Sequence, residues 1–343
     1  MKLQWRWLTM NKTLEIYHAL LQDLQKNKYN PSSNIHRKYT CTNQIGIVYS
    51  VSVGARMRAL SIPADKTSQN MNFPVWKGVR IELVTMPDYS PNNQLYIQLQ
   101  QMPGTEPYIF EIVADDLRRG IDTMPSGQGS TKRTTEILKK WKEFFTAGKL
   151  PILSGAAAQG LYGELLFLSE LINNMGTMAV NYWSGINNET HDFYIGQNAV
   201  EIKTTSTQAP YMAHINSEYQ LDDHDVNGRL YLRMYAFRKD TNGGQRLPEI
   251  IGVIREMLKS DYSSRNIFEG KLAKAGYLDV AEDYYQEGYT IRDTYSFEIK
   301  DNFPRIVKKN VPNGIYELEY SISIAQCMDY AIESKDLFKG IKG

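Results

Sequence analysis

The spacing of hydrophobic positions changes along the chain and predicts an opening helix followed by strands. Apolar residues recur every three or four positions over residues 11–27, which is typical of an amphipathic helix. The period then shortens, and strands are predicted at 45–53, 78–84, 95–99 and 108–113, separated by turns rich in Pro, Gly and Asn. The N-terminal region is therefore expected to be β-rich.

A short segment at 124–130, with the sequence Met-Pro-Ser-Gly-Gln-Gly-Ser, is interpreted as a linker because these residues suit turns. A helix is predicted directly after it. The polar side of this helix carries several basic residues that face either solvent or phosphate, namely Lys132, Arg133, Lys139, Lys140 and Lys142. The linker predicts two domains, over residues 1–125 and 130–343.

The second domain is expected to mix helices and strands. Helices are predicted at 161–172, 248–258 and 267–275, and Gly176 is expected to end the first of them. Strands are predicted at 179–183, 193–195, 200–205, 229–237, 290–299 and 314–324. This order of elements favours the α+β class.

The composition narrows the class of protein without changing this interpretation. The chain has 343 residues, 42% of them hydrophobic and 22% charged, which is ordinary for globular proteins. Cys41 and Cys327 have no nearby cysteine partner, which suits a reducing compartment and argues against a structural zinc site. The sequence also lacks a membrane-spanning run and a secretory signal, so we expect a cytoplasmic protein with no membrane partner. Its net charge of +1 neither indicates nor excludes nucleic-acid binding.

Candidate chemistry is concentrated between residues 192 and 203. Two short apolar runs flank Gly-Gln-Asn at 196–198, a sequence that suits a tight β-hairpin and would bring Asp192 back toward Glu201. Because side chains alternate along a strand, Glu201 and Lys203 should project from one face, roughly 6–7 Å apart. Two carboxylates and an amine are therefore expected to converge.

This combination suits the hydrolysis of phosphodiester bonds. Magnesium prefers hard oxygen ligands and commonly binds one or two carboxylates together with water and substrate phosphate. We expect Asp192 and Glu201 to be the metal ligands, with the backbone carbonyl of Ile202 as a further oxygen. Lys203 is expected to orient the attacking water and to stabilise charge on the scissile phosphate. Mg²⁺ is the expected cofactor, and Mn²⁺ is expected to substitute for it.

A third carboxylate, Glu164, lies on an apolar helical face between Leu161 and Leu168. A buried acid needs a partner, so Glu164 is expected to reach the metal cluster directly or through water. Gly160 and Gly163 are expected to let this helix approach the sheet closely. The alternative is a solvated hairpin, since an acidic residue two positions before a lysine is common in exposed strands.

Several segments resemble a known family, the bacterial PD-(D/E)XK proteins whose genes often lie among restriction and phage-defence systems. The resemblance covers about residues 155–225 and is carried by four segments, at 160–168, 183–185, 191–193 and 200–205. It implies a restriction-endonuclease-like fold, in which helices flank a mixed central sheet. It also implies that four residues belong to the active site, namely Glu164, Asp192, Glu201 and Lys203. His191 stands where the family name has proline, and we expect it to be structural.

The resemblance further implies a magnesium-dependent DNA endonuclease that acts in restriction or phage defence. Residues 130–343 would form the nuclease core with a C-terminal elaboration, and residues 1–125 would recognise DNA or a partner. Gln220 matches a polar position that could contact substrate. Two alternatives stay open: an RNA-directed nuclease, because hydrolysis reads phosphate rather than base, and a catalytically silent module that binds nucleic acid or protein in a defence complex.

The expected partners follow from this function. DNA is the expected substrate, and a cognate methyltransferase or an ATPase/helicase of the same defence system is an expected associate. The chain has no glycine-rich phosphate loop, so any ATPase activity would come from such a partner. A homodimer is expected because double-strand cleavage usually needs two active sites. The acidic segment 222–225, with His224, is either a second metal site or a solvated turn.

Overall fold

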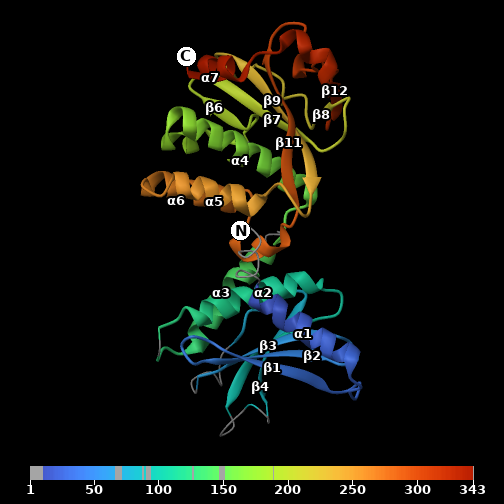
Figure 1. Ribbon diagram of the computed structural model, residues 1–343, viewed down its shortest axis with the longest axis vertical. Helices are drawn as coiled ribbons and strands as arrows, with labels where there is room; N and C mark the ends of the chain where they lie inside the picture. The colour runs from blue at the N-terminus through green and yellow to red at the C-terminus, as the bar shows by residue number, and fades with distance from the viewer. Residues whose placement is uncertain are drawn as a thin grey trace. The chain divides into compact units, whose positions relative to one another are not determined.

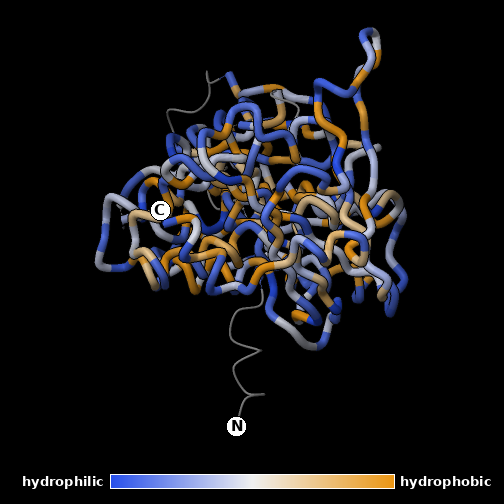
Figure 2. Tube along the Cα trace, turned by 90° about the horizontal axis from the view of Figure 1, so that it is seen from above, coloured by the Kyte–Doolittle hydropathy of each residue, from blue (hydrophilic) through white to orange (hydrophobic). Residues whose placement is uncertain are grey.

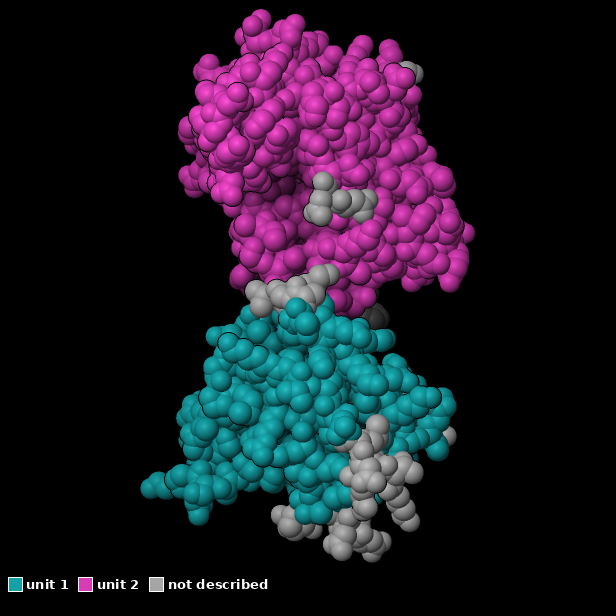
Figure 3. Space-filling model, turned by 180° about the vertical axis from the view of Figure 1, so that it is seen from behind, with its two compact units in different colours: residues 1–151 teal, residues 152–343 magenta. Residues whose placement is uncertain are grey.

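The computed structural model describes residues 11–65, 72–86, 89, 94–125, 127–146, 151–187 and 189–342. The chain divides into two compact units, Met1–Pro151 and Ile152–Gly343, which Figure 3 shows in different colours. Hydrophobic and hydrophilic positions interleave along the trace (Figure 2), in keeping with the short periods of the sequence. In the described ranges no helix is long and apolar enough to cross a membrane.

Unit 1 is built on a five-stranded antiparallel sheet with helices on one of its faces (Figure 1). Its strands, in their order across the sheet, are β1 (Asn34–Thr40), β2 (Gly46–Ser52), β3 (Arg58–Pro63), β5 (Leu95–Gln101) and β4 (Val79–Thr85). Its helices are α1 (Lys12–Lys26), α2 (Pro107–Asp122) and α3 (Ser130–Thr146). The β-rich N-terminal region expected from the sequence is confirmed.

The core of unit 1 lies between this sheet and its helices. Alternate strand residues point to the helical side, and among them Tyr49 and Leu60 are fully buried. The ring of Tyr17 on α1 packs edge-on against Tyr49 and against Phe110 of α2, with centroid distances of 5.2 and 6.2 Å. Aromatic packing therefore holds the helices to one face of the sheet, while the other face carries polar residues beside a smaller hydrophobic cluster of Val48, Met86 and Tyr96.

One strand prediction in unit 1 is wrong. Residues 108–113, expected as a strand, form the first part of α2. Pro107 stands in the first turn of this helix, where the missing amide hydrogen costs nothing. Phe110, Leu117 and Ile121 recur at helical spacing, and all three are buried. The run of apolar residues at 108–113 belongs to this longer helical pattern rather than to a strand.

The structure places the boundary between the units after Pro151, not at the predicted linker near residues 125–130. The cause is the packing of α3, which lies against α2 in unit 1. Trp141 Nε1 on α3 donates to Asp116 Oδ2 on α2 at 2.9 Å. The segment rich in turn residues therefore connects two helices of one unit.

Unit 2 contains a mixed five-stranded sheet (Figure 1), as predicted for the second half of the chain. Its strands, in their order across the sheet, are β10 (Gln245–Arg246), β11 (Gly288–Ile299), β9 (Leu230–Asp240), β7 (Asn198–Thr205) and β6 (Phe193–Ile195). β7 runs parallel to β9, and the other neighbouring strands are antiparallel. A second, two-stranded sheet pairs β8 (Met212–Ile215) with β12 (Tyr320–Ser323).

The helices of unit 2 are α4 (Gly155–Met175), α5 (Leu247–Met257), α6 (Tyr262–Lys274) and α7 (Ser334–Lys342). Shorter 3₁₀ helices are η3 (Thr177–Tyr182), η4 (Gly185–Asn187), η5 (Asp279–Tyr284), η6 (Lys308–Asn310) and η7 (Ile324–Tyr330). The prediction of the α+β class, with a mixed central sheet flanked by helices, is confirmed.

The two faces of the central sheet have different neighbours. α4 packs on the face that carries Ile202 and Thr204 of β7. The opposite face is covered by β8, β12 and η7, where Ala199, Ile215 and Ile322 share one hydrophobic cluster. Since side chains alternate along β7, its residues 199, 201 and 203 point to this second face.

Two strand predictions in unit 2 need correction. Residues 179–183 form most of η3, and only Trp183 makes an isolated bridge, to Phe193. The strand expected at 314–324 is confined to β12. Gly176 ends α4 with φ of +84°, as predicted, and this left-handed turn leads directly into η3.

Candidate active site

The predicted hairpin forms between β6 and β7. Phe193 pairs with Val200 and Ile195 with Asn198, and Gly196 takes a φ of +61° in the turn. β6 is short, so the edge of β7 is not covered by a strand beyond Val200. Beyond this point the side chain of Asp192 pairs with β7, since its Oδ2 accepts a hydrogen bond of 2.7 Å from the backbone amide of Ile202. The hairpin thereby places Asp192 beside the middle of β7.

Glu201 and Lys203 lie on one face of β7, as the alternation of strand residues predicted. Lys203 Nζ is 2.8 Å from Glu201 Oε1. The N–H and C=O of a strand residue point to the same side, so the carbonyl of Ile202 faces the same open edge as its amide. Asp192, the Ile202 carbonyl and the Glu201–Lys203 pair are therefore brought together at the edge of the sheet.

Glu164 reaches this cluster from α4, on the opposite face of the sheet. α4 approaches β7 at Gly163, where an added Cβ would lie 2.3 Å from Thr204 Cγ2. A Cβ at Gly160 would meet nothing within 4 Å, so the predicted close approach holds for Gly163 and is wrong for Gly160. Glu164 Oε2 accepts a hydrogen bond of 2.7 Å from Trp183 Nε1.

Burial and neighbouring carboxylates raise the pKa of Glu164 and of Asp192. Burial raises the pKa of Glu164 to about 7, the charge of Glu201 adds to this effect, and the Trp183 hydrogen bond opposes it. The pKa of Asp192 lies well above its ordinary value because of burial, the charge of Glu201 and the charge of Glu164, in that order. Lys203 lowers both pKa values. With all three carboxylates ionised, the cluster would carry more negative charge than one lysine compensates.

A divalent cation fits this donor set. Glu201 is 1% exposed, and its Oε2 is buried without a hydrogen-bond partner. Such an oxygen is costly unless something binds it. Within the described residues no three His, Cys, Asp or Glu side chains are arranged to hold a metal ion. A cation here would thus depend on Asp192, Glu201 and the Ile202 carbonyl, completed by water and substrate phosphate, which is a typical environment for Mg²⁺.

Gln220 is tied to the cluster through Lys203. Its Oε1 accepts hydrogen bonds from Lys203 Nζ at 2.7 Å and from the backbone amide of Asn216 at 2.8 Å. The side chain therefore holds the amine between Glu201 and the loop that carries Gln220. This places Gln220 where it orients Lys203, whereas the resemblance had suggested a contact with substrate.

Trp183 positions Glu164, a role that the sequence did not predict for it. Trp183 is completely buried and bridges to Phe193 while its indole donates to Glu164. Lys271 of α6 donates to the carbonyls of Val180 and Asn181, at 2.9 and 3.0 Å, and also to that of Trp183. α6 therefore supports the indole that positions Glu164, a chain of contacts with no local signal in the sequence.

His191 lies behind Glu201 and is fully buried. Its Nδ1 is 3.8 Å from Glu201 Oε2 and its Nε2 is 3.4 Å from Asp225 Oδ1. Neither ring nitrogen has a hydrogen-bond partner. Asp225 is itself held by Tyr194, whose hydroxyl donates to Asp225 Oδ2 at 2.6 Å. His191 thus fills the space between the cluster and the segment 222–225.

The segment 222–225 is held as a turn by ordinary contacts. Asp222 accepts hydrogen bonds from the backbone amides of His224 and Lys308, at 3.1 and 3.0 Å. Arg305 donates to Asp223 at 3.1 Å. These contacts favour the turn over the second metal site that the sequence had left open.

The raised pKa of Glu164 gives a pH-dependent stability. Its folded pKa of about 7 exceeds the ordinary value of 4.5 for a glutamate, so the native state holds the proton more tightly than the unfolded state. The free energy of unfolding should therefore fall as pH rises between these two values, by on the order of 2–3 kcal/mol. Glu164→Gln should reduce this slope, and the raised pKa of Asp192 should account for what remains. Denaturant unfolding of both proteins between pH 4.5 and 8 measures it, and an unchanged slope in the variant would contradict the assignment.

Comparison with known proteins places the chain in a family. The family model described as "Putative PD-(D/E)XK family member, (DUF4420)" matches residues 5–325. No curated protein and no solved structure matches the chain. The mixed sheet, the hairpin and the clustered residues described above are consistent with the PD-(D/E)XK fold. Since the match extends over nearly the whole sequence, the chain belongs to this PD-(D/E)XK family.

Proposed function

We propose that the protein is a magnesium-dependent endonuclease that hydrolyses phosphodiester bonds of DNA. The observation that carries this proposal is the convergence of Glu164, Asp192, Glu201 and Lys203 at one buried edge of β7. Burial of several carboxylates beside one amine destabilises a protein and is retained where a function requires it. Family membership supports the same conclusion, since many PD-(D/E)XK proteins are nucleases.

Asp192, Glu201 and the carbonyl of Ile202 would hold the metal ion, with Glu164 close by. The ion would act as a Lewis acid on the phosphate and favour ionisation of a bound water. Lys203 carries the further chemistry: its ammonium group is held between Glu201 Oε1 and Gln220 Oε1, where it can orient a water and stabilise charge on a phosphate oxygen. Glu164, with a pKa of about 7, can take up or release a proton near neutral pH.

We also propose a role in restriction or phage defence, together with a cognate methyltransferase or an ATPase/helicase. The sequence resemblance supports this role. A homodimer would supply the two active sites that a double-strand break needs. In this proposal unit 2 carries the chemistry, and unit 1 recognises DNA or a partner.

The proposed activity is tested by incubating the purified protein with supercoiled plasmid in Mg²⁺, in Mn²⁺ and in EDTA. Nicked or linear plasmid is expected with either metal and none with EDTA. A single-stranded RNA of mixed sequence, added at equal phosphate concentration, decides the substrate class, because faster cleavage of the RNA would contradict the DNA assignment. DNA binding without cleavage in either metal would contradict hydrolysis by this chain alone.

A further inference from the structure

The helix-free face of the unit 1 sheet carries a row of polar side chains. Strand pairing aligns His36 with Ser50, Val48 with Ser61, and Ser61 with Gln98, so all of these residues share one face. Tyr49 and Leu60 of the same strands point to the other face and pack under the helices, whereas Val48 and Tyr96 lie on this face, in a buried cluster with Met86. Amide and hydroxyl groups beside this small apolar cluster can offer a ligand both hydrogen bonds and apolar contact.

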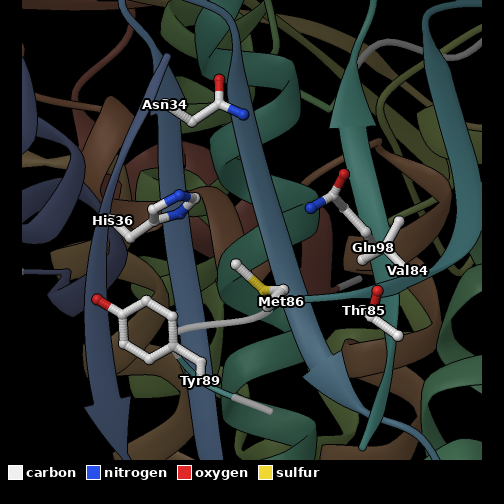
Figure 4. Close-up of a pocket in the computed structure, with 7 residues that line it drawn as sticks. All are labelled: Asn34, His36, Val84, Thr85, Met86, Tyr89 and Gln98. Carbon is white, nitrogen blue, oxygen red and sulfur yellow. The ribbon is translucent and has the colours of Figure 1, made fainter. Parts of the chain in front are cut away.

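A cavity of about 280 Å³ opens on this face. Asn34 and His36 of β1 line one side and Gln98 of β5 lines another, with Met86 between them (Figure 4). Tyr89 adds an aromatic wall, and its ring contacts His36 at a centroid distance of 5.8 Å. The cavity thus has polar groups at its sides and polarisable apolar groups in its wall.

Two of the polar groups are held in place from the floor of the cavity. His36 Nδ1 lies 2.7 Å from Ser50 Oγ, and Gln98 Nε2 donates to Ser61 Oγ at 3.1 Å. Both serines are buried, with exposed fractions of 3% and 0%. A side chain fixed in this way loses less conformational entropy when a ligand binds, so the amide of Gln98 is preorganised.

The chemistry of the wall limits the ligand. The described lining residues are mainly uncharged polar and apolar side chains, with Asn34 and Gln98 as the amides. Amide groups suit the edge of a planar heterocycle, while Met86 and Tyr89 suit its faces. The volume lies below the range of pockets for drug-sized ligands but accommodates a single base. Enzymes that read an unstacked base use this combination of edge hydrogen bonds and apolar contact.

We propose that this cavity binds one unstacked base of a DNA strand. The choice of DNA as the polymer rests on the proposed function, whereas the base itself follows from the cavity. A DNA strand can add contacts of its backbone outside the cavity, so we expect it to bind more tightly than the isolated nucleoside.

The test follows the methyl signal of Met86 by NMR in protein labelled with ¹³C at the methionine methyl group, and Met86→Leu identifies the signal. The full chain is titrated, without metal, with each of the four deoxynucleosides and with a short single-stranded oligodeoxynucleotide. A saturable shift is expected for at least one nucleoside, with an apparent affinity at least tenfold higher for the oligonucleotide. No shift with any probe would overturn the proposal.

Gln98→Leu removes the amide edge and should weaken binding at least tenfold. Gln100→Leu is the matched control, because Gln100 lies on the same strand and the same face but outside the lining, and it should bind normally. An equal shift in Gln98→Leu and Gln100→Leu would overturn the assignment. If Gln98→Leu fails to fold, Asn34→Ala at the exposed start of β1 decides in its place, with the same expected loss.

The outcomes separate the possible sources of the base and separate this site from the nuclease site. Nucleoside binding that is no weaker than oligonucleotide binding would identify a site for free nucleosides and overturn the DNA assignment. Asp192→Asn should leave the Met86 titration unchanged, because the readout needs neither metal nor cleavage. Base binding without DNA cleavage would therefore contradict only the proposed nuclease activity. Cleavage without base binding would contradict only the base site.

Discussion

Asp192→Asn is expected to reduce DNA cleavage by at least about 10²–10³-fold. The substitution keeps an oxygen that can accept from the Ile202 amide but removes the negative charge that a cation would need. The remaining anionic ligand, Glu201, is already paired with Lys203. Initial rates of plasmid nicking in Mg²⁺ give the measurement.

Glu298→Gln is the matched control for this loss. Glu298 lies on β11 of the same sheet and is paired with Arg229 and Lys300, away from the cluster. Its replacement removes one carboxylate from unit 2 and should leave the cleavage rate within about twofold. Equal rates for Asp192→Asn and Glu298→Gln would show that the cluster is not the site of hydrolysis.

Alanine substitution at Gly163 and at Gly160 should have opposite effects on stability. A methyl group at residue 163 would overlap Thr204 Cγ2, and Thr204 is held by a hydrogen bond of 3.1 Å between Gln159 Nε2 and its Oγ1. α4 would have to move away from β7, at a cost of about 1–3 kcal/mol in the free energy of unfolding. The same shift would displace Glu164 and lower cleavage.

Gly160→Ala is the control three residues earlier on the same helix. Its methyl group would meet nothing within 4 Å, so the higher helix propensity of alanine should stabilise the protein by up to about 1 kcal/mol. Urea unfolding of the two variants and the wild type measures both values. A Gly163→Ala protein as stable as Gly160→Ala would contradict the close packing of α4 on β7.

The position of the cluster at a sheet edge explains how residues from two faces can meet. Glu201 and Lys203 point to the face covered by β8, while Glu164 comes from α4 on the other face. They meet because β6 ends and leaves the edge of β7 open, where Asp192 binds the Ile202 amide. A longer β6 would pair with the Ile202 amide and take the place that Asp192 occupies at this edge.

The hairpin and its charged residues could be predicted because their signals are local. Alternating apolar residues and a Gly-Gln-Asn turn determine the pairing of β6 with β7, and pairing determines which side chains share a face. The inward position of Glu164 followed in the same way, from its place between Leu161 and Leu168 on one helical face.

Non-local packing explains what the sequence could not show. The apolar run at 108–113 fits either a strand or a buried helix, and the longer spacing to Leu117 and Ile121 is what distinguishes them. The turn-rich segment near residue 125 resembles a domain linker until the packing of α3 on α2 is known. The contacts of Trp183 with Glu164 and of Lys203 with Gln220 join residues 17–19 positions apart, through side chains whose directions depend on the fold.

The unfolding temperature tests most directly whether the clustered carboxylates form a cation site. Wild type and Asp192→Asn are each measured in EDTA and in Mg²⁺ at pH 8. In EDTA the variant should be more stable by roughly 1–2 kcal/mol, because it removes the cost of burying a charge at residue 192 and the repulsion from Glu201 and Glu164, which together raise the pKa of Asp192. Mg²⁺ should raise the unfolding temperature of the wild type and leave that of the variant unchanged. An equal Mg²⁺ effect on both proteins, or no effect on either, would contradict a cation site at this cluster.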